Sequence, residues 1–284
     1  MKLQGYLIEK FNNMGDAYTC RRLLEEAKRR DVGLTMVGVH DTFLHDGEVY
    51  NDGHALEPRD FVINRYKWGC VKDGINSLAQ RSYNALDAFN IYVSKYEQLR
   101  RLTLSGIYVP KYLLGTALMD YQIPARRLGV PFVAKGLKSS MGIQVFLIKD
   151  ENDYLELRKK SGTEKEWIFQ EFISESRGRD LRLYSVRGNV AAAMIRSSRD
   201  DFRANVALGA KVEPCAVTEE MQRAAGEIYS QTGLDFLGID LLFGKEGLCF
   251  CEINVMPGCE GMEEATGVNI AGLVIGTIAG DFER

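Results

Sequence analysis

The sequence feature that most constrains the fold is a pair of short apolar runs near the C-terminal end, residues 238–243 and 249–254, on either side of a Gly-Lys-Glu-Gly turn. Two apolar runs around a glycine-containing turn predict an antiparallel β-hairpin. Side chains alternate across a strand, so a register that places Asp240 opposite Glu252 defines two faces. One face would carry Asp240, Leu242, Phe250, Glu252 and Asn254. The other face would point to the core with Ile239, Leu241, Phe243, Cys249, Cys251 and Ile253.

The polar face of this hairpin gathers two carboxylates and an amide oxygen at one end: Asp240, Glu252 and Asn254. A buried pair of carboxylates is unfavourable unless a cation neutralises it. Hard oxygen ligands on a rigid platform suit Mg²⁺, which keeps its other positions for water and substrate phosphates. The hairpin therefore predicts a magnesium site. An edge hairpin with solvated acids is the alternative that these residues leave open.

Length and charge narrow the class of protein. The chain has 284 residues, more than one average domain, which predicts two or three subdomains. A net charge of −3 gives no electrostatic footprint for a nucleic-acid binder. The six cysteines form no CxxC pair and are expected to be free thiols. The start lacks the apolar core of a signal peptide, and residues 270–279 are too short to span a bilayer. We therefore expect a cytoplasmic protein with no membrane or nucleic-acid partner.

The N-terminal third predicts an open α/β domain. Residues 1–40 show a β-α-β pattern but no GxGxxG sequence of a dinucleotide site. All three histidines, His40, His45 and His54, lie in the turn-rich segment 40–60. No helical HxxxH or HExxH spacing supports metal ligation, so loop histidines are expected.

Three polar features follow along the chain. Lys135 lies on a predicted strand just before the small-residue turn 138–142, whose backbone N–H groups could fold over phosphates. Ser94 and Thr218 are predicted to cap two helices, and Lys95 begins the first of them, where the helix dipole does not favour a cation. The polar pair Gln170-Glu171 interrupts an apolar strand that could hydrogen-bond an adenine edge, and Arg203 lies in a basic loop suited to anions. Ordinary turns, edge strands and solvated loops are the alternatives for each feature.

The order of these features is more specific than any of them alone. No Walker A, GxSxG or HExxH sequence is present. A strand lysine before a small-residue turn is followed by a Gln-Glu-aromatic-Ile strand, an Asp-x-Arg strand, a Phe-Arg-x-Asn loop and an Asp…Glu-x-Asn hairpin. In this order the chain resembles the ATP-grasp ligases, and among them the RimK-like group that attaches amino acids to carboxylates. The resemblance covers residues 92 to 278 and is strongest at 201–205, 238–254 and 258–272.

This resemblance implies an α/β (α+β) ATP-grasp fold in which the nucleotide lies between two α+β subdomains. We expect an N-terminal pre-ATP-grasp domain at 1–92, a first ATP-grasp subdomain with the phosphate-covering hairpin at 93–174, and a second with the Mg²⁺ site at 175–284.

The resemblance also assigns roles to residues. Lys95 and Lys135 match the lysines that contact nucleotide phosphates, and Ser139, Ser140 and Gly142 match the phosphate-covering turn, here with fewer glycines than usual. Glu171 and Phe172 match the adenine-holding segment, and Asp180 a further nucleotide contact. Arg203 and Asn205 match the catalytic loop beside the transferred phosphoryl group. Asp240, Glu252 and Asn254 match the ligands of two Mg²⁺ ions, for which Mn²⁺ is an expected substitute.

The implied activity is that of an ADP-forming ligase. ATP would phosphorylate a carboxylate, and an amine would displace the phosphate to form an amide. The expected substrates are a glutamate-like amino acid and the carboxylate of a protein C-terminus, a peptide or a coenzyme tail, in a dimeric or tetrameric enzyme. A peptide-crosslinking ligase and a nucleotide-binding regulatory module without turnover are the alternatives.

Overall fold

The computed structural model describes residues 2–137, 144–162, 165–204 and 209–283. Its N-terminal part is a parallel sheet in the order β2-β1-β6-β7. The strands are β1 (Gln4–Glu9), β2 (Gly33–Gly38), β6 (Arg59–Asn64) and β7 (Ala79–Tyr83). The predicted β-α-β start is confirmed, with α1 (Tyr18–Arg29) connecting β1 to β2. Between β2 and β6 in the sequence, three strands form a separate small sheet: β3 (Thr42–His45), β4 (Glu48–Asn51) and β5 (His54–Ala55). Helix α2 (Cys70–Asn76) follows β6, and helix α3 (Leu86–Tyr92) follows β7.

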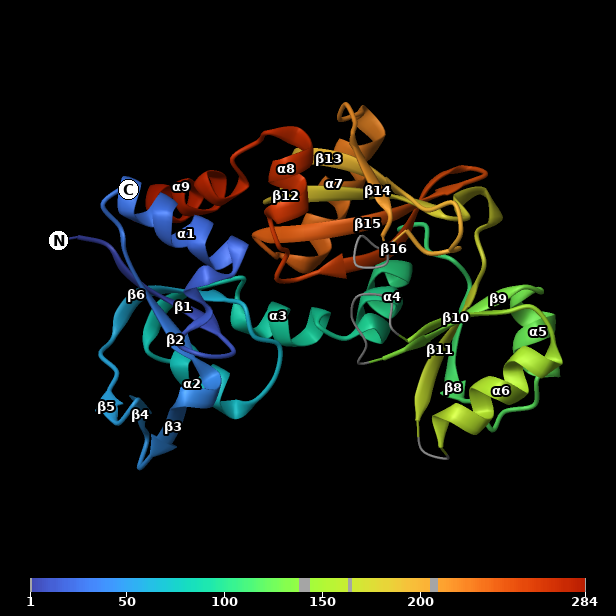
Figure 1. Cartoon of the computed structure of the whole chain (residues 1–284), viewed down its shortest axis with the longest axis horizontal. Coiled ribbons are helices and arrows are strands. Elements are labelled where there is room, and N and C mark those ends of the chain that lie inside the picture. Colours follow the sequence, from blue (N-terminus) through green and yellow to red (C-terminus); the bar gives the residue numbers. More distant parts are fainter. Residues whose placement is uncertain (1, 138–143, 163–164, 205–208, 284) are drawn as a thin grey trace.

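The middle part is an antiparallel sheet in the order β10-β9-β11-β8. Its strands are β8 (Tyr112–Thr116), β9 (Phe132–Gly136), β10 (Val145–Ile148) and β11 (Glu166–Glu171), and its helices are α5 (Gln122–Leu128) and α6 (Glu151–Ser161). The two helices cover one face of the sheet (Figure 1), where Phe132, Trp167 and Tyr154 form a buried core. The opposite face carries Val133 and Lys135 and is turned toward the rest of the molecule.

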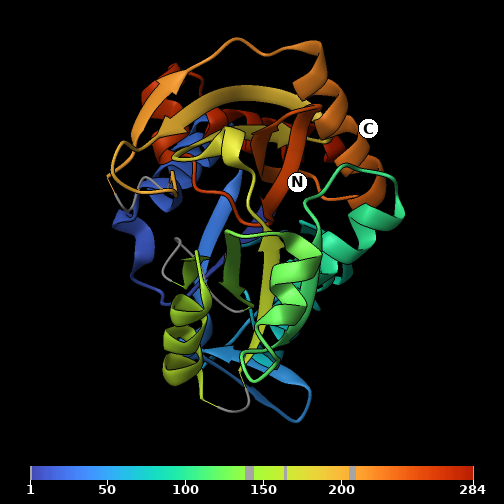
Figure 2. The same ribbon diagram turned by 90° about the vertical axis from the view of Figure 1, so that its right-hand side faces the viewer.

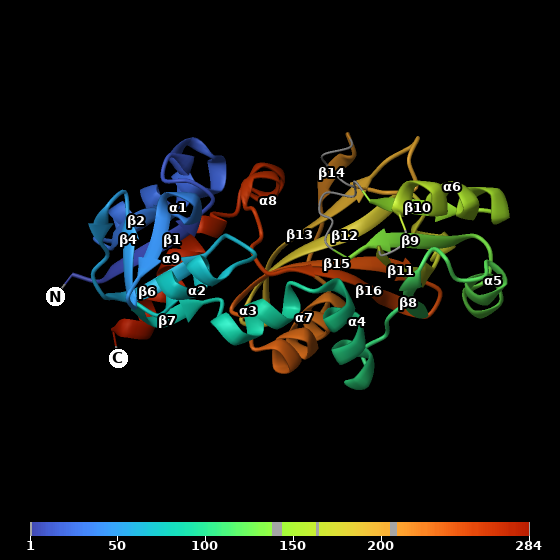
Figure 3. The ribbon, with the colours of Figure 1, turned by 90° about the horizontal axis from the view of Figure 1, so that it is seen from below.

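The C-terminal part is an antiparallel sheet in the order β14-β13-β12-β15-β16. Its strands are β12 (Arg179–Val186), β13 (Asn189–Ser197), β14 (Lys211–Pro214), β15 (Phe236–Gly244) and β16 (Gly247–Asn254). Figure 2 shows this sheet above the middle sheet. Helices α4 (Lys95–Leu104) and α7 (Glu219–Thr232) pack on its far face (Figure 3). Both helices start at the predicted caps, since Ser94 and Thr218 accept hydrogen bonds from the backbone N–H groups of Glu97 and Met221.

The last two helices return to the N-terminal sheet. They are α8 (Glu260–Thr266) and α9 (Ile270–Phe282). Helix α9 packs against α1, and its Ile275 and Ile278 share a buried core with Leu7 and Phe61. Both chain ends therefore lie beside the N-terminal sheet (Figure 1). Divisions at residues 92 and 174 fall between the three large sheets, and the three domains stay a proposal.

No single helix among the described residues is long and apolar enough to cross a membrane. Helices α8 and α9 together satisfy the length and composition of a span, but they are bent by 112° relative to each other.

The hairpin confirms the predicted pairing of Asp240 with Glu252 and corrects the register nearer the turn and the predicted faces. Asp240 pairs with Glu252, but the register shifts between Asp240 and Leu241, so that Leu241 pairs with Phe250. A β-bulge places one extra residue on a strand and reverses the alternation beyond it. Phe250 is therefore buried in the core, and Cys251 faces the interior cavity described below. The predicted placement of these two side chains was wrong.

The anchoring of α9 gives a first prediction, for Asp281. Its carboxylate accepts hydrogen bonds from Arg187 Nη1 at 2.9 Å and from the Tyr83 hydroxyl at 2.6 Å. The bonds from Arg187, opposed by burial, lower the pKa of Asp281 to about 2 from an ordinary value of 3.8. The stabilisation is therefore complete above the unfolded-state pKa and is lost as the pH falls through 2. Asp281→Asn should lower the free energy of unfolding by about 2 kcal/mol at neutral pH and by about half of that at pH 3.

Denaturant unfolding of both proteins at the two pH values measures this difference. Asp46→Asn, in the exposed turn between β3 and β4, serves as the control. A difference that stays the same at pH 3 and pH 7 would contradict the role given to the ionised carboxylate.

Candidate active site

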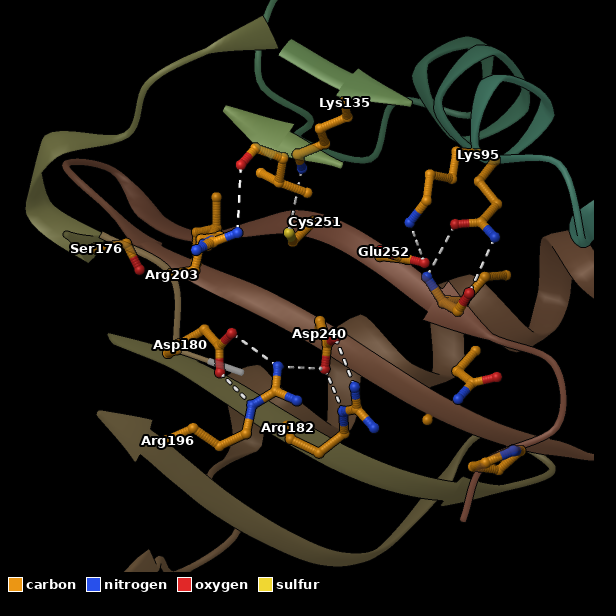
Figure 4. Close-up of a pocket in the computed structure, with 18 of the residues that line it drawn as sticks. Lys95, Lys135, Ser176, Asp180, Arg182, Arg196, Arg203, Asp240, Cys251 and Glu252 are labelled. Carbon is orange, nitrogen blue, oxygen red and sulfur yellow. Dashed lines mark hydrogen bonds and ion pairs between the residues drawn. The ribbon is translucent and has the colours of Figure 1, made fainter. Parts of the chain in front are cut away.

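A cavity of about 470 Å³ lies between the middle sheet and the C-terminal sheet, and the N-terminal part closes one end. Every predicted site residue that the structure describes lines this cavity: Lys95, Lys135, Glu171, Phe172, Asp180, Arg203, Asp240, Glu252 and Asn254. Figure 4 shows several of these side chains converging from both sheets and from α4. The remaining predicted residues, Ser139, Ser140, Gly142 and Asn205, lie outside the described residues.

Two lysines reach the cavity from different elements. Lys95, the first residue of α4, forms an ion pair with Glu252 (Figure 4). This carboxylate explains how a cation is tolerated at the N-terminal end of a helix, where the dipole disfavours it. Lys135 projects from β9, and its Nζ lies 3.6 Å from Cys251 Sγ. The two ammonium groups therefore contact neighbouring residues of the same strand, β16.

A buried network of alternating charges forms the floor of the cavity. Arg196 donates two hydrogen bonds of 2.7 Å to Asp180, and its Nη2 lies 3.1 Å from Asp240. Arg182 binds the other side of Asp240, with 2.7 Å between its Nη2 and Oδ2. Burial opposes ionisation of Asp240, but the charges of Arg182 and Arg196 lower its pKa. For Asp180, burial and the charge of Asp240 outweigh the bonds from Arg196 and raise its pKa.

The two ends of the cavity differ in character. Phe172 follows β11, and its ring centroid lies 6.3 Å from that of Phe202. Glu171 accepts a 3.3 Å hydrogen bond from the backbone N–H of Lys111. The end near these residues carries two aromatic rings, which suits a heterocyclic base. The other end, near Pro257 and Lys67, is built by the N-terminal part and the loop after β16.

Arg203 is oriented by its own loop. Asp201 accepts hydrogen bonds from Arg203 Nε at 3.0 Å and from its Nη2 at 2.6 Å, and the backbone carbonyl of Val145 accepts one from Nη1 at 3.4 Å. The hydrogen bonds from Arg203, opposed by burial, lower the pKa of Asp201. The guanidinium group thus connects the loop after β13 to β10 of the middle sheet.

The donor set fits a magnesium–nucleotide complex. Asp240 and Glu252 are carboxylates that pair with the side chains of Arg182 and Lys95. Asn254 lies beside them, and its amide oxygen accepts a 3.1 Å hydrogen bond from the backbone N–H of Met256. Gln170, which also lines the cavity, is 2% exposed, and its Nε2 has no hydrogen-bond partner among the described residues. A buried amide without a partner is unfavourable by about 1–3 kcal/mol, so a polar ligand in the cavity would satisfy it.

The histidines do not contribute to this site. His40 lies 3.2 Å from the Tyr66 hydroxyl, and His45 and His54 are exposed. Over the described ranges, no three His, Cys, Asp or Glu side chains come together as a metal cluster. His45 and His54 lie on strands β3 and β5, so the expectation of loop histidines was wrong for these two residues.

The comparison with known sequences decides the family. The RimK-like ATP-grasp domain matches residues 93–278. The chain belongs to the RimK-like ATP-grasp family. The expected ATP-grasp fold and ligase class are thereby confirmed, and ATP and Mg²⁺ are the cofactors typical of this family.

Individual relatives agree with the family. A probable alpha-L-glutamate ligase of Haemophilus influenzae is 28% identical over 278 residues, which cover 91% of this chain and 92% of that protein. The ATP-grasp ligase PsnB, solved with a variant of its minimal precursor, Mg and ADP, has a TM-score of 0.74 at 16% identity, with 99% of each chain covered. The macrocyclase MdnC of Microcystis aeruginosa, bound to its precursor peptide MdnA, has a TM-score of 0.74 at 15% identity, with 98% of this chain and 100% of MdnC covered. At these identities the two structures show a shared fold.

Sequence reasoning missed several residues of the RimK-like site. Arg196 was assigned no role, yet it is 4% exposed and joins Asp180 to Asp240. Cys251 was assigned to the core face, and Lys67 was assigned no role. The Asp-x-Arg pattern of β12 was the available signal for the charge network, whereas nothing in the sequence near Lys67 marks it.

Proposed function

We propose that this chain is an ATP-dependent carboxylate–amine ligase that adds a glutamate-like amino acid to the carboxylate of a protein, peptide or coenzyme. The observation that carries the proposal is the meeting, in one cavity, of the Lys95 and Lys135 ammonium groups with the oxygen ligands of Asp240, Glu252 and Asn254. Phosphoryl transfer depends mainly on positioning and on neutralisation of charge, and these groups supply both.

Each residue then has a defined task. Lys95 and Lys135 bind the α- and β-phosphates, and Glu171 and Phe172 hold the adenine. Arg203 stabilises the group being transferred, and Asn205 is proposed as a second catalytic residue. Two Mg²⁺ ions on Asp240, Glu252 and Asn254, replaceable by Mn²⁺, would neutralise the charge that develops on the phosphates.

The proposed reaction has two steps, and each step balances in atoms and charge. A carboxylate oxygen of the acceptor attacks the γ-phosphorus, ADP leaves, and an acyl phosphate forms. The amine of the second substrate attacks the acyl carbon, phosphate leaves, and the amine loses its proton to give an amide. Acyl phosphates hydrolyse in water, so the turn that contains Ser139, Ser140 and Gly142 is proposed to cover the site. A dimer or tetramer in the cytoplasm is the expected state.

A second prediction tests the reaction class. ADP release should require a carboxylate and an amine together, and either alone should give only background hydrolysis. A screen of amino acids with peptide carboxylates, followed by coupled detection of ADP, measures this dependence. A protein that binds ATP but releases no ADP with any pair of substrates would favour the regulatory module without turnover.

A peptide-crosslinking ligase is the second candidate, because PsnB and MdnC share the fold over nearly the whole chain. Mass spectrometry separates the two activities. Ligation adds the residue mass of an amino acid to the acceptor, whereas crosslinking removes water from one precursor peptide.

A further inference from the structure

Lys67 lines the cavity from the N-terminal part, outside the region matched by the RimK-like domain. It follows β6 in a segment that is fixed to the loop after β16. Arg65, two residues earlier, donates a 3.2 Å hydrogen bond to the carbonyl of Pro257 and forms an ion pair of 2.7 Å with Glu9. The half-buried Lys67 is therefore held at the cavity by the packing of two distant parts of the chain.

Among the described cations that line the cavity, Lys67, Lys135 and Arg179 form no ion pair with a carboxylate. Lys95 is paired with Glu252, and Arg182 and Arg196 with Asp240 and Asp180. No ion pair joins Lys67 to any carboxylate in the described part of the chain, although it lines the cavity with them. Burial lowers the pKa of Lys67, the charge of Glu252 counters this effect, and Lys95 adds to it. An anion bound next to Lys67 would offset both the cost of burying its charge and the repulsion from Lys95.

The position of Lys67 argues against a role toward the adenine end. Strand β15 runs the length of the cavity: the N–H of Phe243 donates to the Ser176 hydroxyl at 3.0 Å, and Gly238 lies beside Pro257 and Arg182. These two positions are about 17 Å apart along an extended strand. Lys67 lies with Thr19, Pro257 and Gly258 at the Gly238 end, away from the aromatic pair Phe172 and Phe202.

The remaining anions of the reaction are carboxylates. The ligase chemistry brings an acceptor carboxylate and, when the amine donor is an amino acid, a second carboxylate that is not activated. The phosphates of the nucleotide already have Lys95, Lys135 and Arg203. We propose that Lys67 is a substrate-binding residue that recognises a carboxylate of one of the two organic substrates. This inference rests on the proposed ligase function, and it places part of the substrate specificity in the N-terminal domain.

Two probes distinguish the sources of the carboxylate. L-Glutamate and its α-amide test the amine donor, and an N-acetylated dipeptide ending in glutamate, which has no free amine, tests the acceptor. Binding of each is measured by calorimetry to wild type, Lys67→Met and Lys67→Arg, with Mg²⁺ and a non-hydrolysable ATP analogue present. We expect Lys67→Met to weaken binding of one probe by about tenfold or more, because a charge-assisted hydrogen bond is lost. Lys67→Arg should restore part of that affinity.

The same titrations contain the controls. The affinity for the ATP analogue alone should be unchanged in Lys67→Met, and Lys159→Met, an exposed lysine on α6, should bind like wild type. Weaker binding of the ATP analogue with unchanged binding of both probes would overturn the inference and place Lys67 at the phosphates. Unchanged binding of everything in Lys67→Met would also overturn it. Both results leave the ligase reaction of the wild type intact, whereas a wild type that consumes no ATP with any substrate pair would overturn the proposed function itself.

Discussion

Glu252→Gln is expected to lower the rate of ADP release by on the order of 100-fold or more while the protein stays folded. The substitution keeps the shape of the side chain but removes one of the charges proposed to bind Mg²⁺. It also removes the anion that pairs with Lys95. The Glu252 side chain is 35% exposed, so the fold depends little on its charge. Steady-state ADP release with an active substrate pair measures the effect, and thermal unfolding checks the fold.

The same hairpin provides a matched control for this experiment. Glu246 is exposed in the turn between β15 and β16 and does not line the cavity. Glu246→Gln should therefore release ADP at the wild-type rate. If Glu252→Gln were as active as Glu246→Gln, the assignment of the metal site to this hairpin would be wrong.

Arg196→Met is expected to lower the free energy of unfolding by about 3–5 kcal/mol. The Arg196 side chain is 5% exposed and binds two carboxylates, Asp180 and Asp240, which are each 13% exposed. Removing the guanidinium group leaves Asp180 buried without its partner, and an unpaired buried charge is strongly unfavourable. Methionine keeps much of the volume, so the loss reports the charge network and not a cavity. Urea denaturation measures the difference.

Two further variants make this test specific. Arg199→Met changes an exposed arginine three residues later and should cost less than about 0.5 kcal/mol. Adding Asp180→Asn to Arg196→Met should recover part of the lost stability, because it removes the unpaired charge. A loss below 1 kcal/mol in Arg196→Met, or no recovery in the double variant, would show that the network contributes little to folding.

The hairpin shows how far pattern reasoning reaches. The hairpin itself follows from two apolar runs around a short turn, and the structure has the pairing of Asp240 with Glu252 that the prediction assumed. The turn, which pairs Gly244 with Gly247, would by itself place Asp240 opposite Cys251, so the bulge produces the observed pairing. The faces beyond the bulge do not follow, since one extra residue reverses the alternation of all the side chains after it. Nothing in the composition of residues 249–251 announces the bulge. For this reason Cys251 was expected in the core and lies beside Lys135.

The first residues of helices α4 and α7 were predicted correctly because their cause is local. Ser94 and Thr218 were predicted as caps because a hydroxyl satisfies a backbone N–H of the next turn, and both do so. Such local hydrogen bonds depend on residues three positions apart. The pairing of Lys95 with Glu252, by contrast, joins residues that are far apart in the chain.

The amino-acid sequence by itself determined the elements whose causes are local: the hairpin, the helix caps, and the order of motifs that marks a RimK-like ATP-grasp chain. Only the tertiary structure decided which charges meet. Arg196 lies between Asp180 and Asp240, and Lys67 comes from the N-terminal part to the end of the cavity. The physical reason is range. Periodicity and capping act within a few residues, whereas ion pairing and burial depend on distances in space that packing of the three sheets sets.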